Sequence, residues 1–175
     1  MLAFAGGDAA AFDTLYSRHR GTVFRFVLRS LPDRAQAEEI FQDVWMRVIE
    51  ARGRYEPRAR FTTWVYQIAH NRLVDHWRKR GLALVSLDDE DDPAPEPAAD
   101  PASEPFVQAV ARETVERLSA AIAALPVAQR EAFLLKEEAG LSIAEIAAAT
   151  GTNEEAAKSR LRYAMAKLRE ALDDG

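Results

Sequence analysis

The sequence predicts an all-α protein: two small helical domains joined by an acidic, proline-rich linker. Apolar residues recur at helical spacing through most of the chain, and no useful length of it alternates as a β-strand would. The chain has 175 residues, 48% of them hydrophobic, which is enough for two small cores. Five of its eight prolines fall in residues 88–105. We therefore expect domains at residues 1–87 and 106–175, the second containing a helix-turn-helix.

The composition excludes several classes of protein. Cysteine is absent, so there can be no disulfide framework, thiol nucleophile or cysteine-ligated metal. No apolar run is long enough to span a membrane, and the N-terminus lacks a signal-peptide pattern, so we expect a cytoplasmic protein without membrane insertion. The three histidines lack metal-site spacing and no glycine-rich phosphate loop is visible, so we expect neither an enzyme nor a cofactor.

The net charge of −5 conceals a segregation of charge along the chain. Residues 1–87 carry a net charge of +5, residues 88–105 carry −8 and residues 106–175 carry −2. The acidic segment contains no aromatic or branched apolar residue, so it is expected to be an extended linker. A basic block hidden by an acidic average favours a nucleic-acid partner.

The first block is expected to contain three helices, over residues 8–31, 34–52 and 61–80. Pro32 and Asp33 separate the first two, and glycines follow the second and third. In the second helix, one half of the surface is apolar and the other is polar around an exposed methionine. A solvated face would explain this pattern, and so would a protein-docking surface.

Basic and aromatic residues are interleaved over residues 52–80. The segment holds eight basic residues and five aromatic ones, a combination suited to unpaired DNA or RNA. Trp64 and Ile68 share a helical face with Leu73 and are expected in the core instead. Tyr55, near the turn at Gly53, is the better candidate for an exposed ring.

The second block is expected to contain helices over residues 106–124, 127–139, 142–150 and 154–172. Ser142 and Glu145 form a capping-box pattern, and Thr152 to Glu155 form a second one. Gly151 between the two last helices suits a left-handed turn. This order is that of a helix-turn-helix, at about residues 142–163, whose second helix would enter the major groove.

That second helix divides into two faces. The side expected to face the core carries Ala157, Leu161, Ala164, Met165 and Leu168. The opposite side carries Glu155, Lys158, Ser159, Arg162 and Tyr163. A helical hairpin with a solvated basic face would give the same pattern as a DNA-reading helix.

Taken together, these segments resemble a bacterial sigma factor of the extracytoplasmic-function type, in the sigma-70 family. The matching residues are AFDTLYSRHRGTVFRFV, AEEIFQDVWMRVIEA, RFTTWVYQIAHNRLVDHWRKR, LPVAQREAFLLKEEAGLSIAEIAAATG and TNEEAAKSRLRYAMAKLRE. They cover nearly the whole chain. The resemblance implies a protein that binds core RNA polymerase, directs promoter-specific transcription initiation and is controlled by an anti-sigma factor. It implies sigma region 2 at residues 1–87 and sigma region 4 at residues 106–175.

The resemblance also implies roles for individual residues. Docking on core polymerase falls to Glu39, Gln42, Asp43 and Met46. The residues expected to melt and read the −10 element are Tyr55, Arg58, Arg60, Asn71, Arg72, Arg78 and Lys79. Among them, Tyr55 and Asn71 stand at the positions that receive a flipped-out base. Recognition of the −35 duplex falls to Lys158, Ser159, Arg160, Arg162 and Tyr163. The linker would enter the RNA exit path or serve as a passive spacer.

The sequence departs from the family at the start of the reading helix. Asn153, Glu155, Ala156 and Ala157 stand where family members often carry Pro, Gly, Thr and Val, which leaves the −35 preference open. One alternative function is a helix-turn-helix regulator that acts without polymerase, and another is a sigma mimic that titrates an anti-sigma protein. A regulator that acts without polymerase would not explain the acidic docking helix. A sigma mimic would be expected to lack the basic residues that contact DNA, yet they are present here.

Overall fold

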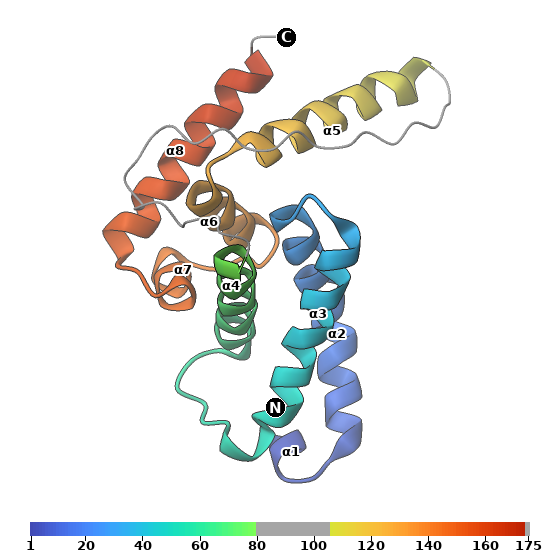
Figure 1. Ribbon diagram of the computed structural model, residues 1–175, viewed down its shortest axis with the longest axis vertical. Helices are drawn as coiled ribbons and strands as arrows, with labels where there is room; N and C mark the ends of the chain where they lie inside the picture. The colour runs from blue at the N-terminus through green and yellow to red at the C-terminus, as the bar shows by residue number, and fades with distance from the viewer. Residues whose placement is uncertain (80–105, 174–175) are drawn as a thin grey trace.

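The computed structural model describes residues 1–79 and 106–173, and in these residues every regular element is helical (Figure 1). The elements are α1 (Leu2–Ala5), α2 (Ala9–Ser30), α3 (Arg34–Glu50), the 3-10 turn η1 (Arg52–Arg54), α4 (Phe61–Lys79), α5 (Phe106–Ala124), α6 (Val127–Glu137), α7 (Ile143–Thr150) and α8 (Glu154–Asp173). The predicted all-α class is confirmed. The predicted linker at residues 88–105 lies outside the described residues. None of the described helices could cross a bilayer, given their length and polarity.

Several of these helices are capped at their N-terminus by a side chain. Asp8 accepts a hydrogen bond from the backbone N–H of Ala11, and Asp33 accepts one from Ala35. Such caps satisfy backbone donors that a helix leaves unpaired at its start. They explain why α2 and α3 begin one residue after an aspartate.

The helix-turn-helix forms as predicted at its first cap and differs at its second. Ser142 Oγ accepts from the Glu145 N–H at 3.3 Å, and Glu145 accepts from the Ser142 N–H at 3.0 Å, which completes the capping box. Gly151 has a φ of 64°, the left-handed conformation expected of it. The expectation of Thr152 as the second cap is wrong: α8 begins at Glu154, so Asn153 caps it, accepting from the Ala156 N–H at 2.8 Å.

In the first half of the chain, α2, α3 and α4 pack around a shared core. The apolar half of α3 is buried as its periodicity predicts, with Val44 and Val48 fully enclosed. Tyr66 of α4 meets Phe26 of α2 edge to face, with ring centroids 5.2 Å apart. This core fixes α3 and α4 with their polar faces outward.

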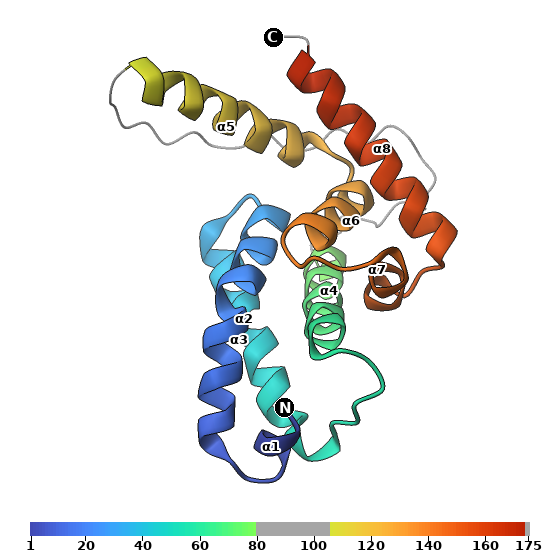
Figure 2. The same ribbon diagram turned by 180° about the vertical axis from the view of Figure 1, so that it is seen from behind.

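In the second half, α6, α7 and α8 enclose a second set of apolar side chains, and α5 packs along α8. Leu134, Leu135 and Leu141 are fully buried there. Figures 1 and 2 show α8 at the outer edge of this half, with α7 between it and α4.

The two halves pack directly against each other, which the sequence did not predict. The first helix of the helix-turn-helix, α7, lies along α4, and α6 lies against α2 (Figures 1 and 2). Buried apolar residues of both halves join in one continuous cluster. A pocket and several ion pairs therefore lie between segments far apart in the sequence.

Candidate functional site

The polar face of α3 is exposed, as its periodicity predicts. The four residues assigned to polymerase docking, Glu39, Gln42, Asp43 and Met46, are all exposed. Met46 retains 54% of its accessible surface. An exposed methionine between carboxylates can adapt to an apolar site on a partner with basic surroundings.

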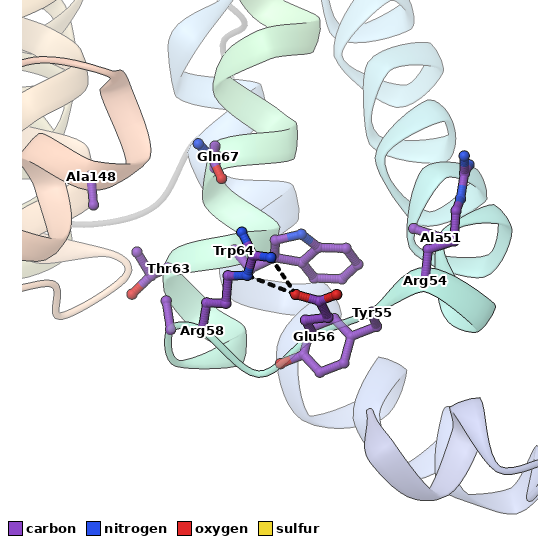
Figure 3. A pocket seen from close by; sticks show the side chains of 10 residues that line it. Ala51, Arg54, Tyr55, Glu56, Arg58, Thr63, Trp64, Gln67 and Ala148 are labelled. Atoms are coloured by element: carbon purple, nitrogen blue, oxygen red, sulfur yellow. Dashed lines mark hydrogen bonds and ion pairs between the residues drawn. The ribbon is translucent and has the colours of Figure 1, made fainter.

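A pocket of about 490 Å³ opens between the loop after α3 and the first turns of α4 (Figure 3). Its lining residues are Ala51, Arg54, Tyr55, Glu56, Arg58, Ala59, Thr63, Trp64, Gln67 and Ala148. Nine come from the first half of the chain, and Ala148 comes from α7.

Two aromatic rings form one wall of this pocket. The Tyr55 and Trp64 rings meet edge to face, with centroids 4.8 Å apart. Both are half-buried, so Tyr55 is less exposed and Trp64 less enclosed than the sequence led us to expect. Burial raises the pKa of the Tyr55 hydroxyl above its ordinary value of 10.0, so this ring stays neutral near neutral pH. Neutral rings of this kind stack on bases of any sequence.

Gln67 is the amide that lines the pocket. It is exposed on α4, and Figure 3 shows it one turn above Trp64. Asn71 is also exposed, but it does not line the pocket. The two amides are four residues apart and share a helix face. The exposed polar stripe on α4 was the signal that could have identified Gln67.

Four of the five basic residues assigned to the −10 element have carboxylate partners in this structure. Arg58 pairs with Glu56 at the pocket rim, while Arg72 and Arg78 both pair with Asp75. Arg60 pairs across the two halves with Glu145, at 3.3 Å. Lys79, the last residue of α4, is exposed.

The outer face of α8 presents most of the residues assigned to the −35 element. Lys158, Arg162 and Tyr163 are exposed, and Ser159 is half-buried. The Arg162 guanidinium lies over the Tyr163 ring, 5.0 Å from its centroid. Stacking of this kind orients a guanidinium without consuming its hydrogen-bond donors.

Two side chains of α8 lie elsewhere than the sequence suggests. Arg160 is only 9% exposed, because its position follows the buried face through Ala157 and Ala164 at helical spacing. Met165, expected in the core, is 41% exposed and stands beside the reading face instead.

Family models of known proteins match both halves of the chain. A model of sigma-70 region 2 matches residues 15–82, and a model of sigma-70 region 4 matches residues 115–168. The RNA polymerase sigma factor CarQ of Myxococcus xanthus is 34% identical over 99% of this chain and 96% of its own length. The ECF RNA polymerase sigma factor RpoE of Cereibacter sphaeroides is 36% identical over 93% of this chain and 87% of its own.

Solved structures share the fold. The sigma factor RpoE of Bartonella quintana, solved with the anti-sigma factor NepR, superposes with a TM-score of 0.70 at 23% identity, covering 93% of this chain and 97% of that one. CnrH, solved with the cytosolic domain of CnrY, gives a TM-score of 0.69 at 23% identity, covering 97% of this chain and 92% of that one.

Proposed function

The chain belongs to the extracytoplasmic-function group of sigma-70 RNA polymerase sigma factors. We propose that α3 binds core polymerase, that α4 recognises the −10 element and that α8 recognises the −35 element. As a sigma factor, it binds core RNA polymerase and directs it to promoter DNA. The observation that carries the assignment is the match of both sigma regions, in order, along a chain that aligns almost end to end with CarQ.

In this proposal α3 docks on core polymerase. Glu39 and Asp43 supply negative charge one turn apart, and the exposed Met46 supplies an apolar contact beside them. Complementary charge speeds association and fixes register, while the apolar contact slows dissociation.

The pocket beside α4 receives one base of the melted −10 element. Flipping a base out of the duplex costs a few kcal/mol, which stacking on Tyr55 and Trp64 would offset at about 1–3 kcal/mol per base. Gln67, which lines the pocket, would hydrogen-bond the edge of that base, and the exposed Asn71 would bond the next one. Arg58 at the rim would hold the adjoining phosphate.

The exposed face of α8 reads the −35 duplex. Arg162 and Lys158 can donate to guanine edges in the major groove, each good contact being worth about 1–3 kcal/mol of discrimination. Glu155, exposed near the start of the helix, would accept from cytosine or repel other bases.

Run-off transcription with purified core enzyme tests the proposal as a whole. The chain should give selective transcripts from a cognate promoter, and core enzyme alone should give none. A helix-turn-helix regulator would instead shift promoter DNA in a gel without polymerase. Tight binding without core enzyme, together with no initiation, would favour that second function.

Control by an anti-sigma protein is the last part of the proposal. It is supported by the shared fold with the Bartonella quintana sigma factor, which was solved with its anti-sigma factor. The test is co-expression with the product of the neighbouring gene. A stable complex that suppresses run-off transcription is expected, and full activity in its presence would remove that candidate.

A further inference from the structure

The short N-terminal helix α1 lies against the segment that builds most of the base pocket. Residues 51–60, the pocket segment, connect α3 to α4 and supply six of the ten residues that line the pocket. The turn η1 lies near the start of this segment, and α1 packs against it (Figures 1 and 2). We propose that α1, through a contact between Phe4 and Arg52, is a positioning element that orders the pocket segment before DNA binds.

Arg52 makes the contact between α1 and the pocket segment. Its guanidinium lies over the Phe4 ring, 5.6 Å from the ring centroid. A cation over an aromatic face is attracted by the ring quadrupole, so this contact depends on the ring as well as on the charge. Arg52 is exposed, and it has no carboxylate partner among residues 1–79 and 106–173. The Phe4 ring is therefore the group that orients this guanidinium.

Phe4 is held from its other side by the core of the first half. It is 6% exposed, and its ring meets that of Phe12 on α2 with centroids 5.0 Å apart. Phe12 in turn meets the buried Trp45 of α3 edge to face, at 6.0 Å. Three packed rings thus connect the core with the guanidinium of Arg52. Because such pairs prefer defined orientations, the position of the Phe4 ring is well defined.

The turn between α1 and α2 brings Phe4 to this place. Gly7 has a φ of 102°, a backbone conformation that favours glycine. The Gly7 N–H donates to the Phe4 carbonyl and the Asp8 N–H donates to the Ala3 carbonyl, both at 3.0 Å. Asp8 then caps α2. These local bonds reverse the chain, so that α1 folds back onto α2 and η1.

The contact extends from Arg52 to the pocket through the backbone of η1. The Arg54 N–H donates to the Ala51 carbonyl at 3.0 Å, which closes the turn. Arg54 and the next residue, Tyr55, both line the pocket. Tyr55 meets Trp64 of α4 there, with ring centroids 4.8 Å apart. The aromatic wall of the pocket is thus supported by α4 on one side and, through η1, by α1 on the other.

The pocket segment has little burial of its own to order it. Eight of its ten residues are exposed, and the other two, Ala51 and Tyr55, are half-buried. A segment that is already held in its binding conformation loses less conformational freedom when a ligand arrives, and it therefore binds more tightly. This role of α1 falls outside the match to sigma-70 region 2, which begins at residue 15.

Spin-label mobility in the free chain tests the support. Because the chain contains no cysteine, Pro57→Cys gives one label at an exposed position of the pocket segment. In this background, Arg52→Ala removes the cation, and Phe4→Leu removes the ring but keeps an apolar side chain. Both should narrow the line shape of the label, because the segment then moves more. A label at Ser17→Cys, exposed on α2, should show no change.

Arg20→Ala is the matched control. The Arg20 guanidinium lies over the Tyr16 ring of α2, 5.9 Å from its centroid, so this variant loses the same charge and the same kind of contact. Arg52→Lys keeps a cation and should retain most of the order. The proposal would be overturned by an unchanged line shape at Pro57→Cys in Arg52→Ala and Phe4→Leu, or by equal narrowing in Arg20→Ala.

Holoenzyme reconstituted with core polymerase tests the effect on DNA, which rests on the proposed function of the pocket. The probe is a single-stranded oligonucleotide pool randomised over the −10 segment. Arg52→Ala and Phe4→Leu should each weaken binding by about two- to fivefold, as expected for loss of one exposed cation–π contact. The double variant should lose no more than Arg52→Ala, because both changes remove the same contact. Affinity for core polymerase should stay unchanged.

The outcomes separate this inference from the proposed function. If the unmodified holoenzyme does not bind the pool, the pocket function is wrong, while the line shape still decides whether α1 orders the segment. If the unmodified holoenzyme binds and Phe4→Leu binds equally well, the positioning role is wrong. A loss in Arg52→Ala alone would then mean that this cation acts on DNA directly. Additive losses in the double variant would also contradict a shared contact.

Discussion

At the scale of single residues, we expect base preference in the pocket beside Tyr55 and Trp64 to depend on which amide of α4 lines it. Gln67 lines the pocket beside Trp64, and Asn71 lies one turn farther along the same face. A side chain that touches the flipped base should affect which base is preferred there. One that lies outside should affect its neighbour.

Gln67→Ala is expected to relax base preference at the flipped position, and Tyr55→Ala to weaken melting by about 1–3 kcal/mol through lost stacking. Asn71→Ala should weaken opening mainly at the adjoining nucleotide. Permanganate reactivity of promoter thymines and a randomised −10 library measure these effects. Tyr55→Phe, which keeps the ring, is the control. Normal melting in Tyr55→Ala would assign that ring to structure.

Glu145 links stability to pH. Its pKa lies below the ordinary 4.5, chiefly because the backbone N–H of Ser142 donates to the carboxylate, with help from Thr63 and Arg60. A carboxyl group whose pKa is lower in the folded than in the unfolded chain stabilises the fold. This contribution to the free energy of unfolding is complete above the unfolded pKa of about 4.5, and it is lost as the pH falls through the folded pKa. Between pH 7 and pH 3, the melting temperature of Glu145→Gln should fall less than that of the unmodified chain. An identical loss in both would contradict the assignment, and Glu170→Gln is the control.

At the scale of elements, α3 and α8 each bury one face and leave the other to a partner. The buried face decides folding, so substitutions on the exposed face should change binding without changing stability. Exposed surface substitutions typically alter stability by less than about 0.5 kcal/mol. Binding and unfolding can therefore be separated on these two helices.

Reversal of both charges on α3, Glu39→Lys with Asp43→Lys, should weaken binding of core polymerase by about tenfold or more, because like charges would then meet across the interface. Pull-down and native gels with core enzyme measure this. Asp13→Lys with Glu170→Lys makes the same charge change on other helices and should bind normally. Undiminished binding of the α3 variant would mean that this face is only solvated.

Arg162→Ala on α8 should change which −35 sequence is preferred, since a guanidinium can make two hydrogen bonds to guanine. Lys167→Ala, five residues farther along α8 and exposed, should weaken all sequences alike and lower the salt slope by about one unit, as loss of a phosphate contact does. Promoter activity over a randomised −35 library distinguishes the two outcomes. An unchanged preference in Arg162→Ala would remove it as a base reader.

At the scale of the whole molecule, the two halves touch, with α7 along α4 and α6 against α2, while the proposed function gives each half a different promoter element. Polymerase bound to α3 would hold the first half, and the DNA would set the position of the second. Activity should therefore depend on the length of the promoter spacer as well as on the two elements.

An insertion of five base pairs between the elements should reduce run-off transcription by about tenfold, because it turns the −35 groove by half a helical turn away from α8. Arg162→Ala should then cause no further loss on the lengthened promoter. A further loss of transcription in Arg162→Ala on the lengthened promoter would show that α8 still contacts the −35 element. The spacer length would then not determine where α8 binds.

The sequence by itself determined the longer helices, the caps at Ser142 and Gly151, and the exposed faces of α3 and α8. These features depend on residues within one or two turns of each other, so local spacing suffices to predict them. Only the tertiary structure decided that Gln67 rather than Asn71 lines the pocket, and that Glu138 meets Arg25, 113 residues away. Glu145 carries a clear local signal as a cap, and nothing in that signal reveals its second oxygen facing Thr63. Contacts between distant helices depend on how whole faces pack together, and periodicity predicts the faces but not the pairing.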